Sequence, residues 1–170
     1  GGYYWQEPVI AQLQRFVGMH SVAFVLWNLV HLTNWVLHGI PERFPKLKTI
    51  WIESGVSWIP FTMQRLDNEY MLRSSEAPML KRLPSEYIRE MFFSSQPLER
   101  NDLEALEFNF KKINAETQLL YASDWPHQDF DLPLEGILHA ACPNCYHGGH
   151  EGEGRAAVLV RTRREAAAVV

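Results

Sequence analysis

Two carboxylate side chains follow short apolar segments of this 170-residue chain. Glu53 ends the segment Lys48–Glu53 (KTIWIE), and Asp124 comes shortly after Gln118–Ala122 (QLLYA). In parallel α/β folds the carboxyl ends of the strands carry the chemistry, so both side chains are candidates for a site. A carboxylate fixed there can ligate a divalent metal or accept a proton from metal-bound water. The alternative for Asp124 is a structural cap on the next turn or helix.

The chain is expected to turn directly after Asp124. Pro126 cannot continue a strand ladder, because proline has no N–H group to donate. His127 follows Asp124 by three residues. It is therefore a candidate to line a substrate pocket, and the alternative is a turn histidine that faces solvent.

The elements that must position these residues alternate between helix and strand. Apolar residues at helical spacing predict helices over Pro8–Phe16, Ser21–Ile40, Phe61–Arg73 and Leu98–Ile113. Short apolar runs predict strands over Lys48–Glu53, Met91–Ser95 and Gln118–Ala122, the first of them buried. This alternation indicates an α/β fold with a parallel sheet and covering helices.

The second predicted helix is also a candidate membrane span. No Asp, Glu, Lys or Arg lies between Arg15 and Glu42, and a span needs about 20 apolar residues. However, polar residues recur on one helical face: Asn28, His31, Asn34 and His38. An amphipathic helix of a soluble protein explains this stripe better than a lipid-facing span, so we expect no membrane partner.

Composition limits the class of protein. With 46% hydrophobic and 21% charged residues, the chain is not of the disordered class. A net charge of −4 gives no electrostatic basis for binding nucleic acid or an anionic membrane. Two cysteines cannot make a disulfide framework, so we expect a cytoplasmic protein.

A domain boundary is expected near Pro133. Only one of the 21 aromatic residues, Tyr146, lies beyond it, and residues 151–170 are mostly Gly, Ala, Val and Arg. Such a segment buries too little area to offset its ordering entropy. We therefore predict a domain over residues 1–133 and an unrelated, irregular tail over residues 134–170.

The tail contains the run Cys142-x-x-Cys145-x-His147-x-x-His150. A Cys-x-x-Cys hook is a zinc-binding motif. Four ligands within nine residues leave little chain to form a tetrahedron, so an accidental pattern is the alternative.

Several segments resemble the amidohydrolase-2 family, which includes aminocarboxymuconate semialdehyde decarboxylase, resorcylate decarboxylases and pyrone-dicarboxylate lactonase. Residues 121–127 (YASDWPH), followed by Asp-Phe-Asp at 129–131, are similar to the last-strand motif of that family. Residues 39–48 (GIPERFPKLK) resemble the entry to one of its barrel strands. Further matches, in the family's order, are Glu53-Ser54-Gly55, Trp58-Ile59-Pro60, Arg65-Leu66-Asp67, Glu69-Tyr70 and Pro84-Ser85-Glu86-Tyr87.

The resemblance implies a (β/α)8 TIM barrel with one divalent metal, zinc or else manganese, at its carboxyl face. The expected fold is therefore α/β, formed by the C-terminal strands and helices of such a barrel. Asp124 would be the last-strand metal ligand or the general base on metal-bound water. The implied reaction is hydrolysis of a C–N or C–O bond in a small-molecule substrate, or decarboxylation of a small acid.

Two features depart from the family. Where Glu53 stands, relatives often have a histidine that serves catalysis in decarboxylases. Glu53 would instead orient a metal ligand from the outer shell or form an ion pair with Arg65. The first-strand His-x-His pair is also absent, since the histidines stand at 20, 31, 38, 127, 139, 147 and 150.

The chain is shorter than the roughly 250 residues that a barrel needs. We therefore expect a fragment of an amidohydrolase-like enzyme. The alternatives are a catalytically incomplete chain and a small metal-binding module formed by the Cys/His tail. Open sheet edges further predict a homo-oligomer.

Overall fold

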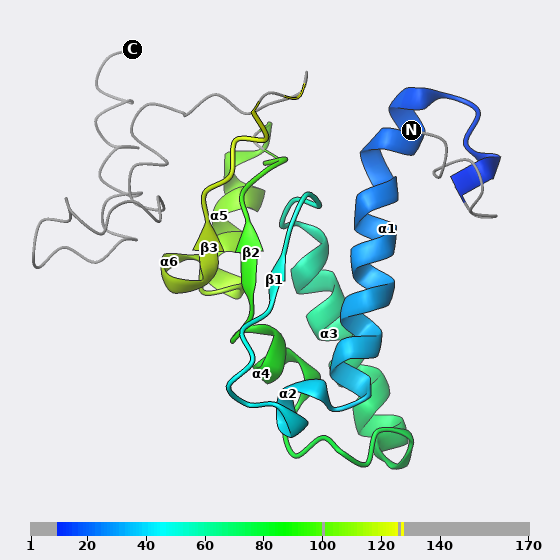
Figure 1. Ribbon diagram of the computed structural model, residues 1–170, viewed down its shortest axis with the longest axis vertical. Helices are drawn as coiled ribbons and strands as arrows, with labels where there is room; N and C mark the ends of the chain where they lie inside the picture. Colours follow the sequence, from blue (N-terminus) through cyan, green and yellow to red (C-terminus); the bar gives the residue numbers. More distant parts are fainter. Residues whose placement is uncertain (1–9, 100, 126, 128–170) are drawn as a thin grey trace, which may run out of the picture.

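The computed structural model describes residues 10–99, 101–125 and 127, which form a small sheet flanked by helices (Figure 1). The elements, in chain order, are η2 (Ile10–Gln12), α1 (Phe16–Leu37), α2 (Ile40–Arg43), β1 (Ile50–Trp51), α3 (Trp58–Arg73), η3 (Ser74–Glu76), α4 (Pro84–Ile88), β2 (Phe92–Ser94), α5 (Leu103–Lys112), α6 (Ala115–Gln118) and β3 (Leu119–Leu120).

The three strands form a parallel sheet in the order β1-β2-β3. Phe93 of the central strand is in register with Trp51 on one side and Leu119 on the other. Figure 1 shows α1 and α3 beside β1 and α5 beside β3, with the carboxyl ends of the strands at one edge. The predicted α/β class and the parallel order are confirmed, although each strand is only two or three residues long.

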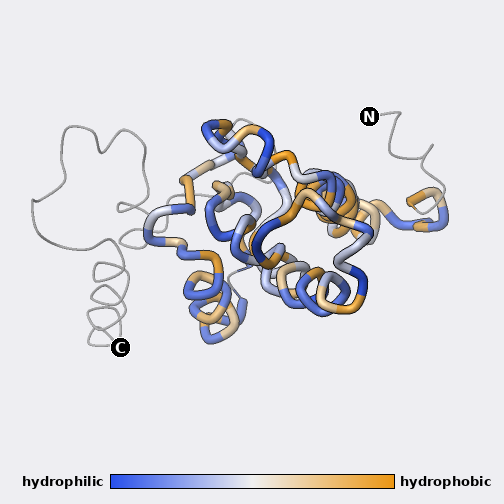
Figure 2. Tube along the Cα trace, turned by 90° about the horizontal axis from the view of Figure 1, so that it is seen from below, coloured by the Kyte–Doolittle hydropathy of each residue, from blue (hydrophilic) through white to orange (hydrophobic). Residues whose placement is uncertain are grey.

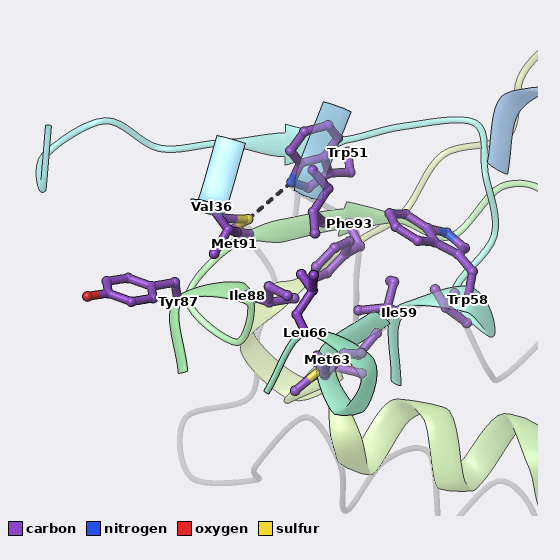
Figure 3. Close-up of a cluster of buried hydrophobic side chains, with 14 of the residues drawn as sticks. Val36, Trp51, Trp58, Ile59, Met63, Leu66, Tyr87, Ile88, Met91 and Phe93 are labelled. Atoms are coloured by element: carbon purple, nitrogen blue, oxygen red, sulfur yellow. Dashed lines mark hydrogen bonds between the residues drawn. The ribbon is translucent and has the colours of Figure 1, made fainter. Parts of the chain in front are cut away.

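The core lies on one face of this sheet. Side chains alternate along a strand, and Trp51, Phe93 and Leu119 are all buried in one cluster with residues of the surrounding helices. Figure 3 shows Phe93 near Ile59 and Leu66 of α3. The Trp51 indole N–H donates a 3.2 Å hydrogen bond to the Met91 sulfur, so the polar atom of this aromatic core residue is satisfied.

The opposite face of β1 is open. Ile50 is 52% exposed and Ile52 is 56% exposed. The expectation of a buried strand over Lys48–Glu53 is therefore wrong for these two side chains. The physical reason is that Trp51 faces the helices, and its two neighbours must then point the other way.

Helix α1 begins five residues earlier than expected, at Phe16. The separate helix predicted over Pro8–Phe16 is wrong, since its described part contains only the short turn η2. Gly39 ends α1 in the left-handed conformation, with φ 68°, as glycine commonly does at this position. A Cβ atom at Gly39 would also come within 2.4 Å of the Met79 Cβ, so no other residue fits without displacing Met79.

The polar stripe of α1 is confirmed. Leu32 and Val36 are fully buried against the core, whereas His31, Asn34 and His38 are exposed. Figure 2 looks almost along α1 and shows both hydrophobic and hydrophilic positions on it. By length and composition alone, α1 is the one helix of the described residues that could cross a membrane, a test that core helices also pass.

Helix α5 is shorter than the predicted Leu98–Ile113. It begins at Leu103 because the Asp102 carboxylate accepts a 3.0 Å hydrogen bond from the Ala105 N–H and caps the helix. Leu106 is buried and Phe110 packs against the core. Leu103 lies in the first turn and is half exposed.

The expected boundary at Pro133 and the tail over residues 134–170 lie outside the described residues.

Candidate functional site

The two predicted carboxylates follow β1 and β3 and lie on either side of the central strand. Two strand spacings of about 4.8 Å separate β1 from β3. Glu53 has a φ of 58° and Asp124 a φ of 59°, so both adopt the left-handed conformation. This conformation costs a non-glycine residue about 1–2 kcal/mol. Such strain persists only where the surroundings impose it, and it gathers at functional sites.

Asp124 and His127 form a pair. The Asp124 Oδ1 atom lies 2.8 Å from the His127 Nδ1 atom, and the His127 backbone N–H donates to the Asp124 carbonyl at 2.8 Å. The Asp124 side chain is 18% exposed and the His127 ring is 68% exposed. A carboxylate at Nδ1 favours the tautomer in which this nitrogen carries the proton and Nε2 is an acceptor. Asp124 thus holds an imidazole at the edge of the sheet.

The Glu53 carboxylate is half-buried and has no hydrogen bond or ion pair with another described residue. The predicted alternative of an ion pair with Arg65 is wrong. Arg65 instead pairs with Glu69, one turn further along α3, at 2.8 Å.

Two buried serines at the carboxyl end of β2, Ser94 and Ser95, were not identified from the sequence. The Ser94 hydroxyl accepts the Glu53 N–H at 3.1 Å and donates to the Gln96 carbonyl at 3.2 Å. The Ser95 hydroxyl accepts the Ala122 N–H at 3.1 Å and donates to the Ala122 carbonyl at 3.3 Å. The central strand thus fixes the chain on both sides, near each carboxylate. Two small polar residues at the end of the apolar run MFFSS were the available signal.

The described residues do not by themselves provide a metal centre. A catalytic zinc takes three protein ligands. Among the residues described, no group of three or more His, Cys, Asp or Glu side chains could hold a metal ion. Asp124 and His127 supply two donors, so a metal at this edge would need ligands from outside the described residues. The Cys/His run of residues 142–150 lies outside them as well.

A pocket of about 130 Å³ lies at the opposite, amino-terminal edge of the sheet, where Thr49 and Met91 precede their strands. It is lined by Tyr87, Glu42 and Arg82, among others. These polar groups already have hydrogen-bond or ion-pair partners, as described next. Because the pocket lies at the opposite edge of the sheet, it is separate from the candidate site.

At this amino-terminal edge the Tyr87 hydroxyl donates a 2.6 Å hydrogen bond to Glu42, and Lys81 pairs with the same carboxylate at 3.1 Å. Both interactions lower the pKa of Glu42. Burial, followed by the hydrogen bond to Glu42, raises the pKa of Tyr87. Arg82 binds Glu90 through two hydrogen bonds, which lower the pKa of Glu90. This network of Glu42, Lys81, Arg82, Tyr87 and Glu90 stabilises the amino-terminal edge of the sheet.

The family model described as amidohydrolase matches residues 9–162. The chain belongs to the amidohydrolase family. Membership in this family suggests a metal-dependent, hydrolase-like function. No curated protein matches the chain.

Proposed function

We propose that this amidohydrolase-family chain contributes the carboxylate-bearing edge of a hydrolase site for a small-molecule substrate. The observation that carries the proposal is the pair of left-handed carboxylate residues, Glu53 and Asp124, at one edge of a parallel sheet. The reaction would be hydrolysis of a C–N or C–O bond. Decarboxylation of a small acid is the second reaction that the family's chemistry allows.

In the proposed mechanism the Asp124–His127 pair moves a proton. With Nδ1 bound to Asp124, the His127 Nε2 atom accepts the proton of a water molecule as that water attacks the substrate. The carboxylate then stabilises the imidazolium that forms. The Glu53 carboxylate, which has no hydrogen bond or ion pair with a described residue, orients the water or a polar substrate group.

We also propose Asp124 as one ligand of a divalent metal, zinc or manganese. This rests on the family and on the residue type, and Oδ1 of Asp124 is engaged with His127. The remaining ligands would come from outside the described residues, because the described ones contain no three-ligand group.

We further propose that the three strands belong to a (β/α)8 barrel. Two observations support this: the strands are parallel, and β1 exposes Ile50 and Ile52 on the face away from the helices. In a barrel that inner face is covered by side chains of the other strands. A soluble, cytoplasmic location is part of the same proposal, supported by Leu32 and Val36 of α1, which pack in the core, and by the exposed polar residues His31 and Asn34. Recovery of the chain only in detergent would contradict it.

The decisive test replaces Asp124 by Asn in the purified chain and measures hydrolysis of a panel of small esters and amides with added Zn²⁺ or Mn²⁺. Because Asp124 orients and stabilises His127, the proposed general base, its loss should lower the rate by about 10²–10⁴-fold. An Asp124→Asn chain that turns over substrate like the wild type would refute the role of Asp124.

A second function, a small metal-binding module, rests on the Cys-x-x-Cys motif of residues 142–150. Elemental analysis separates the two. Metal that is lost in Asp124→Asn but kept in Cys142→Ser supports the strand-end site. The reverse result supports a zinc hook in the Cys/His run.

A further inference from the structure

The loop that connects β1 to α3 is fixed at every residue from 52 to 57. Each of these residues makes a hydrogen bond with a side chain: Ile52 and Ser54 with Asn28, Glu53 with Ser94, Gly55 with Trp58, and Val56 and Ser57 with Glu99. Four different parts of the fold supply these side chains. A loop with this degree of preorganisation is suited to hold a functional group in place.

Asn28 has a particular place among these contacts. It lies in the middle of α1, and its side-chain nitrogen donates two hydrogen bonds, one to the Ile52 carbonyl at 2.7 Å and one to the Ser54 hydroxyl at 2.9 Å. These acceptors belong to the residues directly before and after Glu53. Both hydrogens of the amide are thus used to hold the two ends of the peptide segment that carries the carboxylate.

The conformation of Glu53 explains why such a contact is needed. A glutamate at φ 58° is strained, and it relaxes to an extended or helical conformation unless its neighbours prevent the rotation. The Ser94 hydroxyl accepts the Glu53 N–H, and Asn28 donates to the Ile52 carbonyl of the same peptide group. Asn28 also binds the Ser54 hydroxyl, so this one side chain of α1 contacts the residues on both sides of Glu53.

We propose that Asn28 is a positioning residue that holds the Glu53 carboxylate at the carboxyl edge of the sheet, acting through the Ile52 carbonyl and the Ser54 hydroxyl. This role rests on the proposed function, which places Glu53 in the site. Asn28, the half-buried residue of the α1 polar stripe, thereby has a role in the site.

The test is NMR on the complete, isotope-labelled chain with Asn28→Ala, and with Asn34→Ala as the matched control. Asn34 is the same residue type on the same helix, is exposed, and makes no side-chain hydrogen bond with a described residue. In Asn28→Ala we expect the amide order parameters of Glu53 and Ser54 to fall from about 0.85 to below about 0.6. The φ-dependent coupling constant of Glu53 should shift from its left-handed value toward a conformational average.

A purely structural role for Asn28 would lower the midpoint of unfolding and leave the coupling constant and order parameters of the folded chain unchanged. That result overturns the proposal, as does an equal effect of Asn34→Ala. If Asn28→Ala does not fold, the proposal is tested by amide exchange in the wild-type chain. Its Asn28 side-chain amide protons must then exchange with solvent more slowly than those of Asn34, and equal exchange overturns the proposal.

These measurements need neither metal nor turnover. An Asp124→Asn chain with wild-type activity would therefore refute the proposed function and leave the NMR result for Asn28 standing. Conversely, a loop that stays rigid in Asn28→Ala would remove the positioning role and leave the role of Asp124 intact.

Discussion

Replacing Glu53 by glycine should make the chain more stable, because residue 53 has a left-handed backbone conformation that suits glycine. We infer that a glutamate stands there for the function of its carboxylate. Removal of the left-handed strain at φ 58° contributes about 1–2 kcal/mol. The greater freedom of glycine in the unfolded chain offsets about 0.5–1 kcal/mol of this. The side chain has no hydrogen bond or ion pair within the described residues, so little else is lost. The expected gain is about 0.5–1 kcal/mol.

Urea unfolding followed by circular dichroism measures this gain. For a slope of about 1.5 kcal/mol per molar urea, the midpoint should rise by about 0.3–0.7 M. Glu53→Ala is the first control, because alanine removes the carboxylate but keeps the Cβ atom that causes the strain. Its effect should stay within about 0.5 kcal/mol of zero. Asn114→Gly is the second control: Asn114 also has a positive φ, 53°, but asparagine tolerates it better, so its gain should be smaller.

Two outcomes would refute this reasoning. If Glu53→Gly lowers the midpoint, the carboxylate makes a stabilising interaction and is not free for a ligand. If Glu53→Ala raises the midpoint as much as Glu53→Gly, the gain comes from removing a charge. The backbone strain would then not mark Glu53 as a functional residue.

Two further predictions concern other parts of the chain. Tyr87→Phe should destabilise the chain by about 1–3 kcal/mol near neutral pH, because two backbone N–H groups lose their acceptor and Glu42 keeps only Lys81 as a partner. The lowered pKa of Glu42 contributes stability that is lost as pH falls below 4.5, and the raised pKa of Tyr87 contributes stability that is lost as pH rises above 10. When the free energy of unfolding is measured across pH, Tyr87→Phe should therefore lose less stability in acid than the wild type and should lack the alkaline loss that Tyr87 causes. Unchanged profiles would contradict the network. The chain should also self-associate through the exposed face of β1, and Ile52→Glu should shift sedimentation toward monomer. Leu72→Glu, at a site of similar exposure on α3, should not, and equal effects of the two variants would exclude that face as the interface.

The positions and direction of the strands could be predicted from the sequence, because they depend on local apolar runs. Phe93 and Leu119 lie within predicted strands and are buried as such runs require. The polar stripe of α1 was equally accessible, since helical periodicity is a property of neighbouring residues. The same reasoning placed Glu53 and Asp124 after strands, and the structure puts both at the same edge of the sheet.

The contacts that define the site could not be predicted in this way. In the sequence, Asn28 does not differ from the other polar residues of its helix. Its hydrogen bond to the Ile52 carbonyl joins residues 24 positions apart. A long-range bond from a side chain to the backbone leaves no periodic signal. The left-handed conformation of Glu53 was also hidden, because glycine is the usual sequence signal for it and glutamate is not.

The carboxylate of Glu99 couples two loops that would otherwise be independent. It follows β2, yet it accepts hydrogen bonds from Val56 and Ser57 at the start of α3, at 3.2 and 3.3 Å. A Cβ atom on Gly55 would collide with this carboxylate at 2.4 Å. The loops after β1 and β2 therefore have to be exchanged together when either is grafted from a relative. A transplant of one loop alone would leave the Val56 and Ser57 N–H groups without their acceptor or would create a steric clash.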